Sequence, residues 1–243
     1  MQTLRAAGSA CAAQALGYAE YVPTTYASTA SWPVIIAFHG NGQTGTGSAA
    51  DIGKVDDDGL ARQIALSKWD PSYRFIVLSP QMNTQTRTAQ AVHDFIQFAK
   101  ANYKIDTSRI YLTGLSGGGG PLYAYLDAYA GGEAAAVIPV AAIYSFAGLQ
   151  CGWKNIPVWF FHGALDPTVV PNHSKQAFDG LKACTPAPAV APRFTIYTNV
   201  AHSSWARTYD LSGMTSTLET MIGTDVLNPY DQSIYDWLLQ YHR

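Results

Sequence analysis

A serine set between glycines is the residue of this chain best suited to chemistry. Residues 114–118 read Gly-Leu-Ser-Gly-Gly and directly follow the short apolar run 110–113. A sharp strand-to-helix turn exposes a serine hydroxyl as a nucleophile, and glycines flank it because a Cβ would collide with the neighbouring strand and helix. We therefore expect Ser116 to be a nucleophile. The alternatives are a flexible loop or an anion-binding turn; a nucleotide P-loop is excluded, because no Lys-Ser or Lys-Thr pair follows.

A serine nucleophile needs a base to take its proton and a carboxylate to orient that base. Asp166 follows the apolar run 158–162, and His202 lies on a loop after the last expected strand. Both would reach the C-terminal edge of a parallel sheet, where catalytic groups gather. Taken alone, Asp166 is a turn former before a proline, and a loop histidine is commonly a surface residue. Together with Ser116 they predict a Ser-Asp-His triad.

The other histidines are placed less well for the role of base. His93 lies within an expected helix before the serine, and His242 is next to the chain end. His39 and His162 each precede a glycine at a strand end, where an imidazole usually braces loops by hydrogen bonds. His173 is expected to begin a helix on the surface. The histidine that follows the last strand remains the best candidate.

A tetrahedral intermediate also needs two backbone N–H donors. Gly117, the residue after the serine, supplies the first. The buried run 35–38 opens into a loop that reads His-Gly-Asn-Gly, where Asn41 is the preferred second donor and Gly42 the next. Each donor is expected to contribute about 10²- to 10³-fold to turnover.

The elements that position these residues alternate between short β-branched or aromatic runs and longer runs of helical period. Such alternation predicts an α/β fold with a mainly parallel sheet that is covered on both faces, built as a single domain over residues 1–243. The expected strands are 18–22, 34–38, 75–79, 110–114, 135–140, 158–162 and 194–198, and the expected helices are 60–69, 89–103, 118–129, 173–181 and 231–240.

The composition excludes several classes of partner. The net charge is −2, with 15 Lys and Arg and no basic run, so neither nucleic acid nor an anionic membrane is an expected partner. The longest apolar stretch, 134–147, contains Pro139 and predicts a buried strand and loop, not a membrane span. Asp56-Asp57-Asp58-Gly59 lacks the later ligands of a calcium loop and is better explained as an acidic helix start. We expect a soluble protein, with a monomer favoured, that uses no metal and no cofactor.

The cysteines and the N-terminal residues bear on the compartment. Residues 6–13 are small and only weakly apolar, which makes a poor secretory leader. The low charge and the abundance of Ser, Thr, Tyr and Ala suit a secreted or periplasmic enzyme whose leader is missing from the chain. Cys151 and Cys184 bracket the segment 159–166, and a disulfide between them would staple its loops and leave Cys11 free. Buried thiols are the alternative.

Together these motifs resemble a known family. The matching residues are 39–42, 105–118, 156–166, 202–205 and 235–239. Over nearly its whole length the chain resembles the phospholipase/carboxylesterase-type α/β-hydrolases, and more closely the secreted branch with feruloyl and acetyl-xylan esterases, polyhydroxybutyrate-depolymerase-like proteins and "predicted peptidases". The resemblance implies the α/β-hydrolase fold, the triad Ser116, Asp166 and His202, and an oxyanion hole from Asn41 and Gly117. Relatives often have Met after the nucleophile, so Gly117 is expected to widen the acyl site.

The substrate is indicated less directly. Trp153 and Trp205 are candidates to line the cleft, although core packing is the more common fate of a tryptophan. No insertion is long enough for a large lid, which favours an ester carried by a polymer or polysaccharide. The leading hypothesis is a metal-independent serine ester hydrolase that forms an acyl-enzyme on short-chain or aromatic esters. The alternatives are a prolyl-oligopeptidase-like peptidase, which would need residues for a gating domain, and a catalytically inactive binding module.

Overall fold

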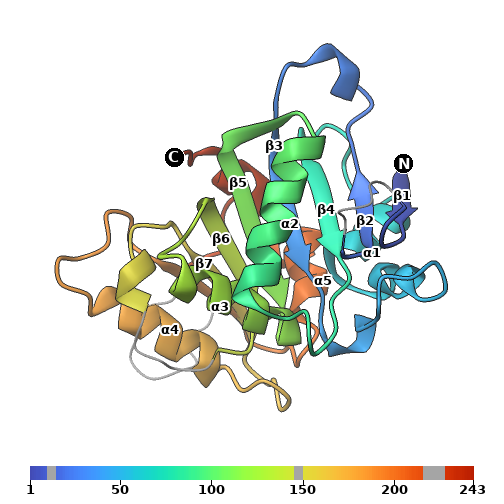
Figure 1. Cartoon of the computed structure of the whole chain (residues 1–243). Helices are drawn as coiled ribbons and strands as arrows, with labels where there is room; N and C mark the ends of the chain where they lie inside the picture. The colour runs from blue at the N-terminus through green and yellow to red at the C-terminus, as the bar shows by residue number, and fades with distance from the viewer. Residues whose placement is uncertain (10–14, 145–149, 216–227) are drawn as a thin grey trace.

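The apolar runs of the sequence pair into one sheet. The computed structural model describes residues 1–9, 15–144, 150–215 and 228–243, and within them an eight-stranded sheet has the order β1-β2-β4-β3-β5-β6-β7-β8 (Figure 1). Strands β3 to β8 are parallel to one another, whereas β1 and β2 form an antiparallel edge. The strands are β1 Gln2–Arg5, β2 Tyr18–Tyr21, β3 Trp32–Phe38, β4 Ile76–Pro80, β5 Ile105–Leu115, β6 Ala134–Val140, β7 Trp159–Gly163 and β8 Arg193–Tyr197.

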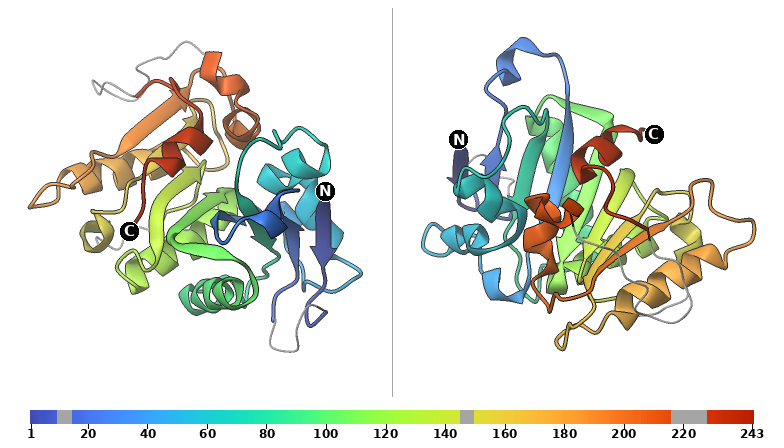
Figure 2. Two further views of the ribbon diagram at one scale, coloured as in Figure 1. Left: turned by 90° about the horizontal axis from the view of Figure 1, so that it is seen from above. Right: turned by 180° about the vertical axis from the view of Figure 1, so that it is seen from behind.

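Helices cover both faces of this sheet. On one face lie α2 (Ala89–Asn102), α3 (Gly119–Ala128) and α4 (Asn172–Lys182), as Figure 1 shows. The other face, seen from behind in Figure 2, carries α1 (Gly59–Ala65), α5 (Ser204–Tyr209) and α6 (Ile234–Leu239). The expected architecture, a mainly parallel sheet between two layers of helices, is confirmed.

The central strand β3 shows how the sequence builds two cores. Successive side chains of a strand point to opposite faces. Val34, Ile36 and Phe38 enter the core under α2 and α3, whereas Ile35 and Ala37 enter the core under α1 and α6. All are apolar because a parallel strand is buried on both faces. This buried strand fixes the position at which the His-Gly-Asn-Gly loop begins.

Two short elements were not expected from the sequence, and a third ends before its expected boundary. Strand β1 is partly exposed, and pairing with β2 holds it in place. Helix α1 ends at Ala65, before the expected boundary, because Ser67 takes the left-handed conformation at a φ of 56°. Helix α5 has only 6 residues, too few for a periodic apolar pattern.

The acidic run before α1 is a helix start, as expected. Asp58 is the N-cap of α1, and its Oδ1 accepts a hydrogen bond from the Gly59 N–H at 2.9 Å. A carboxylate at this position satisfies a free amide and complements the helix dipole. The same Oδ1 accepts a bond from the Trp205 Nε1–H at 2.6 Å, which ties α1 to α5.

A disulfide joins two segments on the α3–α4 side of the molecule. Cys151, in the 3-10 turn Gln150–Trp153, is bonded to Cys184 just after α4, with 33 residues of separation and a Cα–Cα distance of 5.5 Å. Closing a loop of that length contributes about 4 kcal/mol in the chain-entropy model. The disulfide between Cys151 and Cys184, one of the two alternatives that the sequence left open, is present. Cys11 lies outside the described residues.

Within the described part of the chain, no helix has the length and apolar character needed to cross a bilayer. The apolar segment 134–147 begins with the fully buried strand β6, which contains Pro139, as expected. Residues 145–147 lie outside the described residues, as do residues 10–13 of the N-terminal segment.

Candidate active site

Ser116 occupies a strained turn between β5 and α3. Its φ is 50°, in the left-handed region that residues with a side chain rarely adopt. The strain is held by close packing: a Cβ on Gly114 would lie 2.6 Å from the Gly118 carbonyl oxygen, and one on Gly118 would lie 2.4 Å from that of Phe38. The glycines of the motif are thus needed for the reason expected from the sequence. A tight, over-determined turn of this kind projects the serine hydroxyl from the sheet edge.

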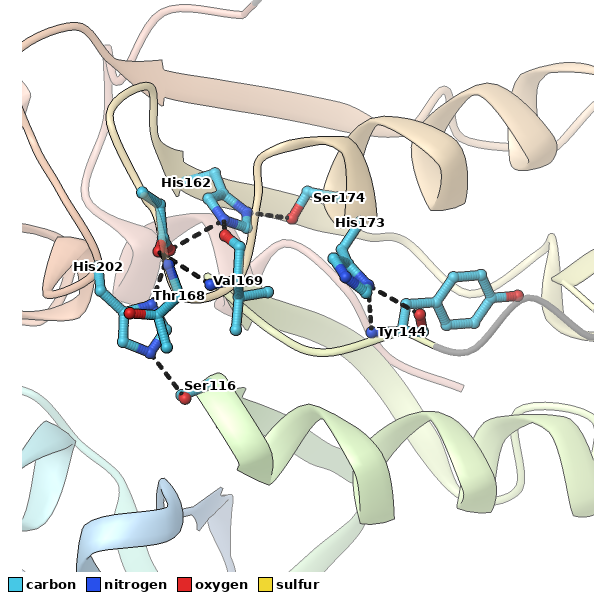
Figure 3. A network of polar contacts seen from close by, with 9 residues as sticks. Ser116, Tyr144, His162, Thr168, Val169, His173, Ser174 and His202 are labelled. Carbon is cyan, nitrogen blue, oxygen red and sulfur yellow. Dashed lines mark hydrogen bonds and ion pairs between the residues drawn. The ribbon is translucent and has the colours of Figure 1, made fainter.

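His202 lies next to this hydroxyl. Its Nε2 faces the Ser116 Oγ (Figure 3), and the two atoms are 2.8 Å apart. The ring of Trp205 stands edge-on to the imidazole, with centroids 4.9 Å apart at an interplanar angle of 88°. Because the indole is fixed by its bond to Asp58, the imidazole has a rigid wall on that side. The histidine of the loop after β8 is therefore held where a base for Ser116 must stand.

Asp166 orients the imidazole from the opposite side. Its Oδ2 lies 2.7 Å from the His202 Nδ1, and its Oδ1 accepts bonds from the N–H groups of Thr168 and Val169 at 2.9 and 3.0 Å. Burial alone would raise the pKa of this carboxyl, but the bonds from His162, His202 and these amides hold the pKa well below its usual value. An ionised Asp166 keeps a proton on Nδ1, so that Nε2 is free to accept the serine proton.

His162 makes a second contact to the same carboxylate. Its Nε2 lies 2.7 Å from the Val169 carbonyl oxygen and 3.2 Å from the Asp166 Oδ2, and its Nδ1 lies 2.7 Å from the Ser174 Oγ. The carbonyl can only accept, so Nε2 carries the proton and Nδ1 accepts from the serine hydroxyl. His162 thus braces the loop between β7 and α4, as expected (Figure 3).

The proposed oxyanion loop lies against Ser116. A Cβ on Gly40 would lie 3.5 Å from the Ser116 Cβ, so this loop and the serine turn are in contact. Asn41 begins the 3-10 turn Asn41–Gln43, and Gly117 is the second residue of the turn Ser116–Gly118. The first N–H groups of such turns have no acceptor within the turn. The two amides are therefore available at neighbouring turns beside Ser116. Gly42 lies on the open side, where a Cβ would have no described atom within 4 Å.

The expectation that Gly117 widens the acyl site is wrong. The space a side chain would take at this position is filled by other residues: a Cβ there would lie 2.1 Å from the Asn41 Oδ1 and 3.0 Å from the Arg87 Nη1. The Arg87 Nη1 donates a hydrogen bond to that Oδ1. The missing side chain is thus replaced by an amide and a guanidinium that come from two other loops.

Neither Trp153 nor Trp205 presents an exposed surface that could line a cleft. Trp153 is 1% exposed, and its Nε1 donates to the Asp127 Oδ1 at 2.7 Å within the core under α3. The expectation that Trp153 lines the cleft is therefore wrong, because this indole finds both its apolar packing and its polar partner in the interior. Trp205 is 5% exposed and contacts His202, so it supports the base instead of presenting a surface to substrate.

His39 braces the start of the proposed oxyanion loop. Its Nε2 accepts a hydrogen bond from the Met82 N–H at 2.8 Å, and its Nδ1 lies 2.6 Å from the Gly40 carbonyl oxygen, to which it donates. This pattern needs a neutral ring. Burial, with the nearby Arg87 charge, lowers the pKa of His39 to about 4, although the Gly40 carbonyl opposes the shift.

We expect the protein to lose stability through His39 as the pH falls from about 6.5 to about 4. The unfolded chain takes up this proton near pH 6.5, whereas the folded protein takes it up only near pH 4. The unfolded state therefore binds more protons in this window, and acid favours unfolding by about 2–3 kcal/mol at pH 4.5. Urea unfolding at pH 7.0 and 4.5 measures this loss. His39→Gln should be less stable at pH 7.0 but show a smaller decrease; equal decreases would contradict the assignment.

Comparison with known proteins identifies the fold. No protein-family model and no curated protein sequence matches the chain, whereas many solved structures do. A thermostable esterase is 22% identical over 94% of this chain and 60% of its own, at a TM-score of 0.66. A protein of Klebsiella pneumoniae subsp. pneumoniae MGH 78578, provisionally named a dienelactone hydrolase, is 14% identical over 99% of both chains, at 0.63. The acetyl xylan esterase of Aspergillus awamori is 14% identical over 86% of this chain and 98% of its own, at 0.57.

These likenesses show that the chain has the α/β-hydrolase fold, as the sequence motifs predicted. The described residues hold no inserted lid domain: the segments that follow β5, β7 and β8 are short, and the longer segment between β3 and α1 holds only two 3-10 turns. The chain spans 60% of the length of the thermostable esterase.

Proposed function

We propose that this protein is a serine carboxylic-ester hydrolase that acts through an acyl-enzyme. One observation carries the proposal: the Ser116 Oγ, the His202 imidazole and the Asp166 carboxylate form a continuous chain of contacts at 2.8 and 2.7 Å. A structural serine in a strained turn has no need of a histidine so placed, and a histidine so oriented is poised to remove the serine proton.

In the acylation step, His202 removes the proton from Ser116 while the Oγ attacks the ester carbonyl. The bond to the leaving alcohol then breaks, and the same imidazole returns the proton to that alcohol. In the second half a water molecule takes the place of the serine hydroxyl: it attacks the acyl carbonyl, gives its proton to His202, and the Ser116 Oγ leaves with that proton. Asp166 keeps its charge throughout and stabilises the imidazolium.

The amides of Asn41 and Gly117 would hold the oxyanion of both tetrahedral intermediates. They come from two loops that the packing of Gly40 against Ser116 fixes in place before substrate arrives. Donors that need no rearrangement are the effective ones, because their ordering is complete before the reaction.

We infer that the substrates are short-chain or aromatic esters, including esters attached to a polymer or polysaccharide. At the edge of the sheet the His202 side chain is 21% exposed, and Ser116 is 8% exposed. Leu165 and Val170, on the loop that carries Asp166, are 58% and 49% exposed and give this loop an apolar surface for an acyl chain or ring. Among the similar structures, the acetyl xylan esterase is named for an ester of a polysaccharide.

We also propose that the protein is secreted or periplasmic, and that it is a monomer with a single domain. The Cys151–Cys184 disulfide supports an oxidising compartment, because such bonds are rare where thiols are kept reduced.

A fluorophosphonate probe and a panel of esters test this function together. We expect the probe to label Ser116, identified by peptide mass spectrometry, and acetyl, butyryl, feruloyl and polyester substrates to be cleaved at rates that rank the acyl preference. Peptides measured alongside should be cleaved far more slowly. Absence of both labelling and ester cleavage would favour the inactive binding module, and cleavage of peptides alone would favour a peptidase.

A further inference from the structure

A guanidinium lies beside the proposed oxyanion hole, on a loop that the sequence motifs did not include. Arg87 follows β4 and precedes α2, and its Nη1 lies 3.0 Å from the position of a Cβ on Gly117. It donates there to the Asn41 Oδ1. Its Nη2 donates to the Gly40 carbonyl oxygen at 2.9 Å and to the Thr44 Oγ1 at 3.1 Å. The charge is thus held rigidly next to the residue that follows the nucleophile.

All of these acceptors are neutral. In the part of the chain that the structure describes, no carboxylate forms an ion pair with Arg87, although other surface arginines, such as Arg5 and Arg193, have one. The side chain is half-buried, and burial lowers the pKa of Arg87 without changing its charge near neutral pH. A partly desolvated cation without a counter-ion is unfavourable, and an anion that comes with the substrate would relieve this.

The guanidinium also retains donors for such an anion. Arginine has five N–H groups. Both hydrogens of Nη2 are used by Gly40 and Thr44, and one hydrogen of Nη1 is used by Asn41. The second hydrogen of Nη1 and the Nε–H have no acceptor among the described residues. The free Nη1–H belongs to the Arg87 atom that lies 3.0 Å from the position of a Cβ on Gly117, beside the residue that follows Ser116.

We propose that Arg87 forms an anion subsite that selects esters carrying a carboxylate close to the scissile bond. The proposal rests on the proposed ester hydrolysis, because the subsite acts only on an ester that Ser116 attacks. It also explains the glycine at position 117, because any larger residue there would displace the side-chain amide of Asn41 and the guanidinium of Arg87. Arg87 is a specificity-determining residue, and the preference comes from a charge-assisted hydrogen bond in a site partly shielded from water.

Matched pairs of esters measure this preference. On the acyl side the charged ester is monomethyl glutarate, and its neutral isostere is methyl 5-oxohexanoate. On the alcohol side the pair is acetoxyacetate and acetoxyacetone. Hydrolysis is followed in a pH-stat, and the ratio of kcat/KM for the charged and neutral members of each pair is compared between the wild type and Arg87→Gln. Comparing ratios removes the intrinsic reactivity of each ester.

We expect Arg87→Gln to lower this ratio about tenfold to a hundredfold for at least one pair, because a hydrogen bond to a charged group contributes about 1.5–3 kcal/mol. The affected pair identifies the side of the ester that carries the carboxylate. Arg87→Lys should restore part of the ratio. High ionic strength should lower the wild-type ratio and leave that of Arg87→Gln nearly constant. Arg74→Gln, which removes the same charge at the opposite edge of the sheet, is the control and should behave as wild type.

A supporting role for Arg87 gives a different result. If the side chain only fixes the Asn41 amide, Arg87→Gln lowers kcat for both members of each pair equally and the ratio stays constant, which overturns the proposal while ester hydrolysis stands. A wild-type ratio unaffected by salt in both pairs also overturns it. If the wild type cleaves no ester of any kind, the proposed function itself fails.

Discussion

Replacing Ser116 with alanine is expected to lower ester turnover by about 10⁶-fold, the largest effect predicted for any single side chain. The Oγ contacts the His202 Nε2 and stands at the end of the strained turn. Alanine keeps the Cβ and the backbone conformation but leaves the base with no nucleophile. Residual hydrolysis about 10³-fold over water would come from the oxyanion amides and substrate binding alone.

The measurement is kcat for 4-nitrophenyl butyrate under saturating conditions, together with thermal unfolding of the same sample. The unfolding temperature should change little, because Ser116→Ala alters neither packing nor φ at this position. Ser72→Ala removes a serine hydroxyl from an exposed turn and serves as the matched control with full activity. If turnover in Ser116→Ala stays within about tenfold of the wild type, Ser116 is not the nucleophile.

The second large effect is expected from Asp166→Asn, at about 10³- to 10⁴-fold in kcat. The two oxygens of this carboxylate face different partners. Oδ1 accepts from the N–H groups of Thr168 and Val169, so the new NH₂ group cannot occupy that place. The NH₂ must therefore face His202, to which it donates at Nδ1. The imidazole proton then moves to Nε2, where it opposes the Ser116 hydroxyl, and the base is held in the wrong tautomer.

Besides kcat, the tautomer of His202 in Asp166→Asn is checked by proton NMR, in the downfield region of the spectrum. The wild type should show a resonance for the hydrogen-bonded His202 Nδ1–H, and the variant should lack it. Asp70→Asn is the matched control, because the Asp70 Oδ1 also accepts a hydrogen bond from the N–H two residues ahead, at 2.8 Å, but on an exposed turn. A loss below tenfold in Asp166→Asn, with the fold intact, would show that His202 is oriented by something else.

The triad geometry follows directly from what the sequence makes visible. Parallel strands that end in turns place their following residues at one edge, so the ends of β5, β7 and β8 bring Ser116, Asp166 and His202 together. Long apolar runs and amphipathic helices carry this information in their periodicity. The interpretation of Asp56 to Asp58 as a helix start holds for a similar local reason, since a cap depends only on the residues next to it.

The surroundings of the site could not be predicted in the same way. Arg87 reaches Gly117 from a loop after another strand, and no motif marks an arginine that fills the space of a missing side chain. The sequence around Trp153 does not distinguish a tryptophan that lines a cleft from one that packs in the core. Its burial in the core under α3 and its bond to Asp127 are seen only in the structure. Side-chain packing between distant loops is set by tertiary contacts, which leave no local pattern in one sequence.

The bond between Trp205 and Asp58 has a consequence for biosynthesis. During synthesis the ribosome releases α1 and the serine turn before it releases His202 and the indole beside it. The indole that contacts His202 is therefore fixed only when Trp205 bonds to Asp58 on the earlier helix α1, across 147 residues of sequence. If Ser116 and His202 act as proposed, a nascent chain displays the serine without its base until α5 has packed against α1.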